Sequence, residues 1–315
     1  MIVVKDPASF RQYHSRCVAT IGKFDGVHLG HQLIIAQLKN RARELELPVL
    51  VILIEPHPEE FFAATEDECP ARLTILEEKL ELLEHYGVDF VFQLTFDRAL
   101  SRLGAEDYVR DILVSGLGVA SFIVGSDFRF GYQRRGDYTL LTTMGEELGF
   151  DVQETVTYER NGQRISSTYI RDRLAAGDFP LVALLLGRPY SIKGDVVAGR
   201  HLGTDLGFPT CNVNPHRRRI PLHGVFACEA LVAGKVLKSA VNIGYRPTVS
   251  DGGEALLEAH LLDFHADLYG SRIEVIFRHK IREEQKFDSL DALKKQIADD
   301  VERVREYFEG SPINP

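Results

Sequence analysis

The chain has 315 residues, of which 44% are hydrophobic and 26% charged, which is typical of a globular protein with about two domains. Its 37 basic and 46 acidic residues leave a formal net charge of −9, which disfavours a protein that binds nucleic acid through its charge. The four cysteines form no Cys-x-x-Cys pair, which argues against a zinc ribbon and a disulfide framework and favours a reducing compartment. Lys5 and Asp6 stand where a signal peptide needs its apolar core, and no apolar run could span a bilayer, so we expect a cytoplasmic location.

The first half of the chain alternates strand-like and helix-like patterns. Apolar, β-branched runs predict strands at 17–21, 48–54, 90–92, 121–124 and 151–157. Apolar positions three and four residues apart predict helices at 33–45, 75–86, 105–117 and 140–148. The run 48–54 is apolar on both faces and is expected in the centre of a sheet. This alternation predicts an α/β fold with a doubly wound parallel sheet, which binds ligands at the carboxyl ends of its strands.

The stretch 21–31, IGKFDGVHLGH, joins the first strand to the first helix. Its glycines let the backbone approach a bulky ligand, and the amide groups at a helix start attract anions. If the helix begins near Leu29, His28 and His31 can face one phosphate and stabilise the charge that develops on it. A plain structural turn or a zinc site are the alternatives, although no further His or Cys follows before His57. The arrangement is similar to the His-x-Gly-His signature of the nucleotidyltransferase superfamily.

Three further stretches follow predicted strands. Glu55–Pro58 comes after the second strand, and 125–131, GSDFRFG, comes after the fourth. A planar, π-rich ligand beside a phosphate would explain the two aromatic residues and Arg129 in the latter. The stretch 165–171, ISSTYIR, opens another helix. Its three hydroxyls can be N-caps, but together with Arg171 they also form an anion cradle suited to the β- and γ-phosphates of a nucleotide.

The pattern changes between 178 and 194, where glycines and prolines replace helical spacing. Short β-branched runs follow at 195–198, 225–228, 230–232, 239–241 and 273–277. Their close spacing predicts a small antiparallel β-barrel, which a charged amphipathic helix from about Ser289 to Phe308 completes. The basic cluster His216–Arg219 lies between two prolines and is interpreted as a solvated loop rather than a polyanion site.

The chain resembles the bacterial bifunctional riboflavin kinase/FMN adenylyltransferase (FAD synthetase) family from Cys17 to near its C-terminus. The matching segments, in order, are IGKFDGVHLGHQ, IEPHP, RLT, GSDFRFG, ISSTYIR, LLGRPY, GFPTCN, NIGYRPTV, EAHLLDF, DLYG and KFDSLDAL. The resemblance implies an FMN adenylyltransferase domain over 1–185 and a riboflavin kinase β-barrel domain with a C-terminal helix over 186–315. It also implies the small molecules riboflavin, FMN, FAD and ATP as substrates and products, and Mg²⁺ as a cofactor.

For the first domain, the resemblance implies that the phosphate of FMN attacks the α-phosphorus of ATP, which releases pyrophosphate and gives FAD. Such transfers depend on positioning and charge neutralisation. His28 and His31 are implied as the catalytic residues at the α-phosphate. Residues implied at ATP and its phosphates are Gly22, Lys23, Phe24, Asp25, Gly30, Ser166, Ser167, Thr168 and Arg171. Residues implied at the flavin are His57, Pro58, Asp127, Phe128 and Arg129. The ammonium of Lys23, where the family also suggests Asn, could favour phosphate or simply lie on the surface.

For the second domain, the resemblance implies that the 5′-hydroxyl of riboflavin attacks the γ-phosphorus of ATP, with Glu258 as the general base. Without the family, Glu258 would be interpreted as an exposed strand carboxylate facing a lysine or arginine. Thr210 and Asn212 are implied as Mg²⁺ ligands, and a Pro-Thr turn with a self-satisfied Asn is the alternative. Residues implied at ATP are Gly207, Pro209 and Thr210, and those implied at the flavin are Arg282 and Phe287.

One departure from the family pattern keeps other functions open. Thr204 stands where the family usually has Arg, so the barrel could bind flavin without phosphorylating it. A non-enzymatic flavin carrier and a nucleotidyltransferase for another acceptor are further alternatives. The histidine pair argues against the carrier, and the barrel motifs argue against the other acceptor.

Overall fold

The structure, a computed structural model, describes residues 1–65, 68–155, 159–160, 163–199, 203, 206–245 and 255–310. Its contacts divide the chain into two compact units. Unit 1 comprises Met1–Cys69 and Leu76–Ser166, and unit 2 comprises Pro70–Ile75 and Ser167–Pro315. The short segment Pro70–Ile75 therefore belongs to unit 2, although the residues before and after it belong to unit 1. We call this segment the strap. No helix in the described ranges has the length and apolar character needed to cross a membrane.

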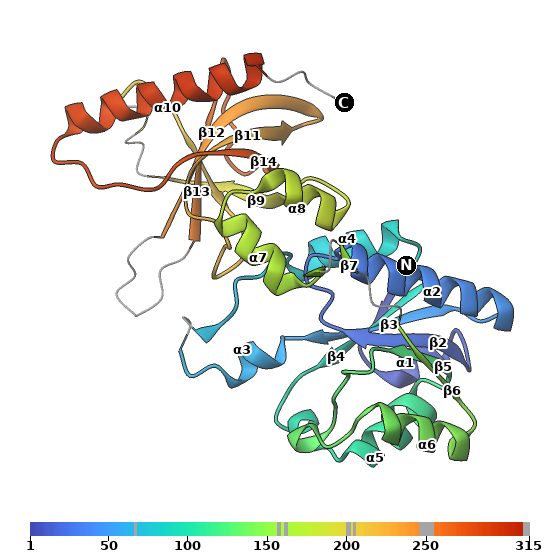
Figure 1. The fold of residues 1–315 in the computed structure, drawn as a ribbon. Coiled ribbons are helices and arrows are strands. Elements are labelled where there is room, and N and C mark those ends of the chain that lie inside the picture. Colours follow the sequence, from blue (N-terminus) through green and yellow to red (C-terminus); the bar gives the residue numbers. More distant parts are fainter. Residues whose placement is uncertain are drawn as a thin grey trace. The chain divides into compact units, whose positions relative to one another are not determined.

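Unit 1 is built on a parallel sheet of six strands with the order β1-β4-β3-β2-β5-β6 (Figure 1). The strands are β1 (Ile2–Val4), β2 (Cys17–Gly22), β3 (Val49–Glu55), β4 (Phe90–Thr95), β5 (Val119–Val124) and β6 (Asp151–Glu154). A separate hairpin is formed by β7 (Glu159–Arg160) and β8 (Gln163–Arg164). All five pairings in the large sheet are parallel, and β3 lies between β2 and β4. The predicted parallel sheet and the central place of this strand are confirmed, whereas the sequence pattern does not predict β1.

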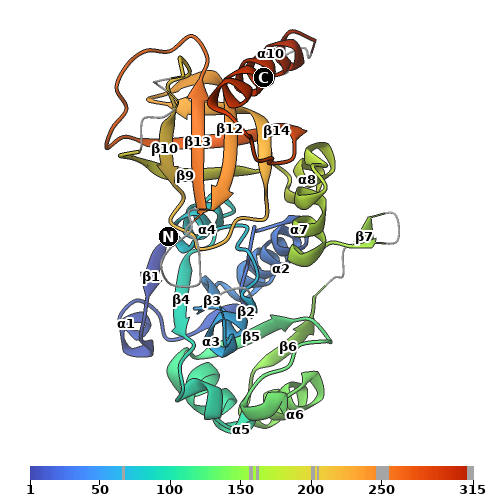
Figure 2. The same cartoon turned by 90° about the vertical axis from the view of Figure 1, so that its left-hand side faces the viewer.

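Helices cover both faces of this sheet (Figures 1 and 2). They are α1 (Pro7–Arg11), α2 (Leu29–Leu45), α3 (Pro58–Phe62), α4 (Leu76–His85), α5 (Ala105–Asp107), a π-helix (Tyr108–Gly116) and α6 (Tyr138–Leu148). Along β3, Val51 and Leu53 face the core that α2 and α4 complete, whereas Leu50 and Ile52 face the core of α1, the π-helix and α6. The single helix predicted over 105–117 is instead one α-helical turn followed by the wider π-helix.

Unit 2 contains a closed antiparallel barrel, which confirms the predicted architecture (Figure 2). Its strands are β9 (Ser191–Val197), β10 (Cys211–Asn214), β11 (Gly224–Val232), β12 (Lys235–Tyr245), β13 (Ala255–Leu261) and β14 (Arg272–Arg282). The two runs predicted at 225–228 and 230–232 form one strand, β11. Glu229, which interrupts the apolar run, pairs with Arg278 of β14 at 2.6 Å, so the strand continues through it.

The helices described in unit 2 include α7 (Ser167–Ala175), α8 (Phe179–Leu186) and α10 (Leu290–Gly310). In α8, Phe179 is buried and stacks on Phe277 of the barrel, with ring centroids 6.1 Å apart. Helix α10 lies along the barrel, where Val304 and Phe308 complete a small core (Figure 1). Both α8 and α10 are therefore part of the packing that stabilises the barrel.

Two arginines hold the strap within unit 2. Arg171 of α7 donates its Nε hydrogen to the Ala71 carbonyl at 2.5 Å. Arg217 donates from Nη1 to the Leu73 carbonyl at 3.0 Å and is only 7% exposed. The interpretation of His216–Arg219 as a solvated loop is therefore wrong at Arg217. A guanidinium can be buried when carbonyl oxygens accept its hydrogens.

Candidate active sites

The first candidate site lies at the carboxyl ends of β2 and β5, where the strand order of the sheet reverses. The chain proceeds from β2 to β3 on one side and later places β5 on the other. Thr20 of β2 donates its hydroxyl hydrogen to the Ile123 carbonyl of β5 at 2.7 Å, which ties the two strands together near this edge. The loops 23–28 and 125–131, both singled out from the sequence, begin here.

The loop between β2 and α2 has an unusual backbone. Phe24, Gly26 and Val27 have φ values of +48°, +81° and +40°. A positive φ is an outlier for a β-branched residue such as Val27 and persists only where the surroundings fix it. Val27 is fully buried, and its carbonyl accepts a hydrogen bond from the Gln32 side chain at 2.9 Å. Burial and this hydrogen bond therefore help to fix the shape of the loop.

His28 and His31 lie face to face, with ring centroids 3.7 Å apart and an interplanar angle of 15°. His28 is the N-cap of α2, and its Nδ1 accepts from the His31 amide at 3.4 Å. The Phe24 ring lies 4.7 Å from that of His31. A Cβ atom at Gly30 would be 3.1 Å from the His28 ring, and one at Gly22 would be 3.1 Å from the Phe24 ring. The glycines therefore leave room for these rings.

The His31 imidazole is held in its neutral form. Burial, together with the charges of His28, Lys79 and Lys23, lowers the pKa of His31 well below its ordinary value. Its buried Nδ1 has no hydrogen-bond partner within the described residues. A buried nitrogen of this kind is a natural contact for a ligand, because unsatisfied polar atoms are rare in folded proteins.

Lys79 is a buried cation that the sequence analysis did not single out. Its side chain is fully buried, with Nζ 3.3 Å from Glu55 and 3.1 Å from the Nε2 of His57. A signal for it exists in the sequence. Lys79 lies three residues after Leu76 and four before Leu83, so it occupies the apolar face of α4. A lysine on such a face needs a partner, and here Glu55 and His57 supply it.

Three further predicted residues of unit 1 have partners within the protein. Lys23 forms an exposed ion pair with Glu59 at 2.6 Å, and His57 is the N-cap of α3, directly before Pro58. Asp127 accepts from Arg164 at 2.8 Å, and this hydrogen bond lowers the pKa of Asp127.

Aromatic side chains lie in the loop after β5, in α3 and directly after β4. Phe128 stacks on Phe130, with centroids 5.3 Å apart, while Arg129 donates to the Phe128 carbonyl at 2.8 Å. Phe62 of α3 is 66% exposed and meets Phe96, which follows β4, at 5.7 Å. Exposed aromatic faces of this kind suit a planar ligand, and Phe62 and Phe96 were not among the predicted site residues.

The residues of the predicted phosphate cradle lie on either side of the sequence position where unit 1 ends and unit 2 resumes. Ser166 is the last residue of unit 1, whereas Ser167 begins α7 of unit 2. Thr168 follows in the first turn, and Arg171, one turn later, holds the strap through its Nε. Their role at the phosphates stays a prediction.

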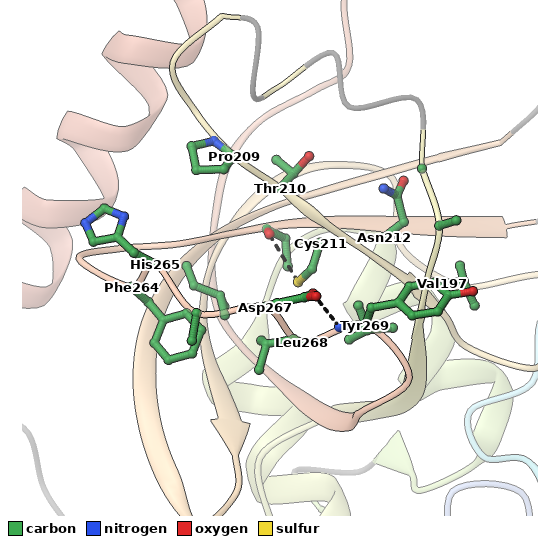
Figure 3. Close-up of a pocket in the computed structure, with 16 residues that line it drawn as sticks. Val197, Pro209, Thr210, Cys211, Asn212, Phe264, His265, Asp267, Leu268 and Tyr269 are labelled. Atoms are coloured by element: carbon green, nitrogen blue, oxygen red, sulfur yellow. Dashed lines mark hydrogen bonds between the residues drawn. The ribbon is translucent and has the colours of Figure 1, made fainter.

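The second candidate site consists of two cavities of unit 2 that share part of their walls. The first, about 430 Å³ in volume, lies between β9, β10 and the segment 264–269 (Figure 3). The second, about 350 Å³, is lined by β12, β13 and α10. Thr210 and Asn212 line both cavities, so one short segment connects the two spaces.

The first cavity combines polar and aromatic groups. Tyr269 is 68% exposed, and its amide donates to Asp267 at 2.9 Å (Figure 3). A Cβ atom at Gly199 would lie 1.8 Å from the Asn212 amide nitrogen, so only glycine leaves space for this side chain. The Cys211 thiol contacts the Ala259 carbonyl at 3.4 Å, and burial raises its pKa to about 11. This thiol is therefore protonated at neutral pH and unreactive.

Glu258 lines the second cavity and faces two amides across the sheet. In the register of the barrel it lies opposite Asn212 of β10 and Asn242 of β12. Within the part of the chain that the structure describes, no lysine or arginine pairs with Glu258. The carboxylate thus lies in the cavity that adjoins Thr210 and has no neutralising cation among the described residues.

Arg282 and Phe287 also line the second cavity, where they contact each other. The Arg282 guanidinium donates to Asp300 of α10 at 2.7 and 2.8 Å and lies 5.8 Å from the centroid of the Phe287 ring. Asp300 is buried, so this pair fixes α10 against β14. Gly207, with a φ of +89°, precedes the shared segment, and Pro209 lines the first cavity. Thr204 lies outside the described residues.

The oxygen donors at the shared segment fit a magnesium ion. Mg²⁺ retains several waters and takes few protein oxygens when it binds together with substrate phosphates. The Thr210 hydroxyl and the buried Asn212 amide, both at the junction of the cavities, supply such oxygens. No cluster of three or more His, Cys, Asp or Glu suited to a metal occurs among the described residues.

The histidine pair at the switch point of a doubly wound sheet, and the closed barrel with two adjoining cavities, are typical of a two-domain transferase that acts on nucleotides. The FAD synthetase family model matches residues 10–169, and the riboflavin kinase model matches residues 186–308. The chain therefore belongs to the bifunctional riboflavin kinase/FMN adenylyltransferase family.

Curated relatives cover nearly the whole chain. One from Escherichia coli (strain K12), a bifunctional riboflavin kinase/FMN adenylyltransferase, is 50% identical over 293 residues and covers 93% of each chain. One of the same description from Pseudomonas fluorescens is 48% identical and covers 97% of each chain. A solved structure described as a macrolide-efflux protein from Streptococcus pneumoniae is 26% identical, with a TM-score of 0.81 over 96% of this chain and 98% of that one.

Proposed function

We propose that the chain phosphorylates riboflavin to FMN and then adenylylates FMN to FAD, using ATP in each step. We assign the adenylyltransferase to residues 1–185 and the kinase to residues 186–315. The observation that carries the kinase assignment is the pair of cavities that meet at Thr210 and Asn212 beside Glu258. One cavity then holds ATP and the other holds riboflavin, with the reacting groups at the shared segment.

In the kinase step, Glu258 accepts the proton of the riboflavin 5′-hydroxyl as its oxygen attacks the γ-phosphorus of ATP. The exposed face of Tyr269 offers a stacking surface in the nucleotide cavity. Thr210 and Asn212 would hold Mg²⁺, which when bound neutralises the phosphate charge. Arg282 acts on the flavin indirectly, because its donors hold α10 as a wall of the cavity.

In the adenylyl step, His28 and His31 donate to the α-phosphate of ATP as the FMN phosphate attacks it and pyrophosphate departs. Both imidazoles are positioned by the protein, because His28 caps α2 and Phe24 packs on His31. Ser166, Ser167, Thr168 and Arg171 then bind the departing pyrophosphate. The aromatic residues after β3 and β5, together with Asp127, accommodate the flavin.

A cytoplasmic location fits this function. All four cysteines are free thiols, as expected for a reducing compartment.

The experiment that tests the proposal is one incubation of the full chain with riboflavin, ATP and Mg²⁺, followed by chromatographic separation of the flavins. We expect FMN to appear first and FAD to follow. A chain that converts FMN to FAD but leaves riboflavin unchanged would instead be an adenylyltransferase whose barrel only binds flavin. A chain that forms neither product would contradict both assignments.

A further inference from the structure

His260 lies two residues after Glu258 on β13, so both side chains project from the same face of the strand. Its Nδ1 is 2.8 Å from the carbonyl oxygen of Pro209. A carbonyl oxygen only accepts hydrogen bonds, so Nδ1 carries the hydrogen and donates it. The imidazole also meets the Phe208 ring edge-on, with centroids 5.7 Å apart. His260 therefore contacts two consecutive residues of the segment that leads into β10.

Among the described residues, the segment 207–210 makes few other hydrogen bonds. The Phe208 amide donates to the Gly203 carbonyl at 2.7 Å, and strand pairing begins only at Cys211, opposite Ala259. In the part of the chain that the structure describes, His260 is the one side chain that hydrogen-bonds to the backbone of 207–210. Its contact is thus well placed to control the orientation of this segment.

The contact acts directly on Thr210. The Pro209 carbonyl and the Thr210 amide belong to one planar peptide group, which also contains the Cα atom of Thr210. Fixing the carbonyl therefore fixes the orientation of the peptide plane to which the Thr210 side chain is attached through Cα. Thr210 lines both cavities, where the proposed phosphoryl transfer takes place.

We propose that His260 is a positioning residue of the kinase step. By donating to the Pro209 carbonyl, it keeps Thr210 oriented at the junction of the nucleotide and flavin cavities. This inference rests on the proposed riboflavin kinase function. It assigns His260 no contact with the reacting atoms.

Three substitutions separate the hydrogen bond from the packing of the ring. His260→Phe keeps a ring beside Phe208 but removes the donor. His260→Asn places an amide nitrogen near the position of Nδ1, whereas His260→Gln places it one bond further out, near Nε2. His279→Phe is the matched control, because exposed His279 stacks on Tyr307 at 5.0 Å and lines neither cavity.

We expect His260→Phe and His260→Gln to lower kcat/KM for Mg-ATP in FMN formation by about tenfold, the effect of one lost hydrogen bond. His260→Asn should stay within about twofold of the wild type, as should His279→Phe. His260 also lines the second cavity, which is proposed to hold riboflavin. Because the inference places the effect of His260 on Thr210 and not on the flavin, riboflavin affinity, followed by fluorescence quenching, should not change in any variant. FAD formation from supplied FMN, measured on the same samples, reports whether each variant is folded.

Two results would overturn the inference. One is wild-type kinetics in all three His260 variants. The other is weaker riboflavin binding that His260→Asn does not restore, which would make His260 a flavin contact. If the wild type formed no FMN, the proposed function would fail, and the affinity for Mg-ADP, measured by calorimetry, would decide the inference alone. An affinity about tenfold weaker in His260→Phe and restored in His260→Asn would support it, and an unchanged affinity would overturn it.

Discussion

Three carboxylates line the second cavity, and Arg282 binds one of them, Asp300. Substituting each of the other two tests which one is the base of the kinase step. Glu258 lies opposite Asn212 and has no cationic partner among the described residues, whereas Glu284 lies 3.3 Å from the Nε2 of His223. Glu258→Gln keeps the shape of the side chain but cannot accept a proton. We therefore expect the rate of FMN formation to fall by about 10²–10⁴-fold, the usual contribution of a positioned base.

Glu284→Gln is the matched control, since it removes the same charge from the same cavity. Both members of its ion pair are about half exposed, at 51% and 43%. An exposed pair of this kind contributes about 1 kcal/mol at most, so the rate should change by no more than about fivefold. Rates are measured by chromatography of the flavins at saturating ATP and riboflavin, with FAD formation from FMN as the control for folding. A large loss in Glu284→Gln together with a normal rate in Glu258→Gln would refute the assignment.

Three further predictions concern unit 1 and the extent of the barrel unit. His28→Ala should slow FAD formation from FMN by about 10²–10³-fold, the effect of losing one preorganised donor, while chromatography still detects FMN formed from riboflavin. The pKa of His31 is lowered in the folded state, so just below its ordinary pKa of 6.5 the unfolded chain binds a proton at His31 and the folded chain does not. The free energy of unfolding therefore falls as the pH falls. His31→Gln should reduce that dependence by up to about 1.4 kcal/mol per pH unit in urea unfolding, and an unchanged slope would contradict the buried, neutral imidazole. A fragment of residues 186–315 lacks Phe179 and should be about 3–5 kcal/mol less stable in urea than a fragment of residues 167–315, and equal stability would show that α8 is dispensable.

The parallel sheet and the barrel could be predicted because their signals are local. Apolar runs such as 48–54 contain the strand pattern within themselves, and their alternation with helical spacing implies the fold class. β1 could not be found in this way, because it has three residues, of which Ile2 and Val3 are exposed. It becomes a strand through pairing with β4, far along the chain.

The same distinction between local and long-range signals applies to the site residues. His28 and His31 lie within one loop and one helix turn, so their spacing alone places them together. Glu258 faces Asn212 only through the pairing of β13 with β10, and no local pattern contains that register. The burial of Arg217 likewise depends on the Leu73 carbonyl, which is 144 residues away in sequence.

The strap has a consequence for how the chain is made. Its carbonyls leave the ribosome 100 residues before Arg171 and 144 residues before Arg217, the side chains that bind them. At a synthesis rate of about 5–20 residues per second, Arg217 is made about 7–29 s after Leu73, whose carbonyl accepts its hydrogen bond. During this interval the nascent chain has most of unit 1 but lacks the arginines that hold the strap. Folding during synthesis therefore cannot proceed strictly from one unit to the next, because an early segment must stay available until a later unit emerges.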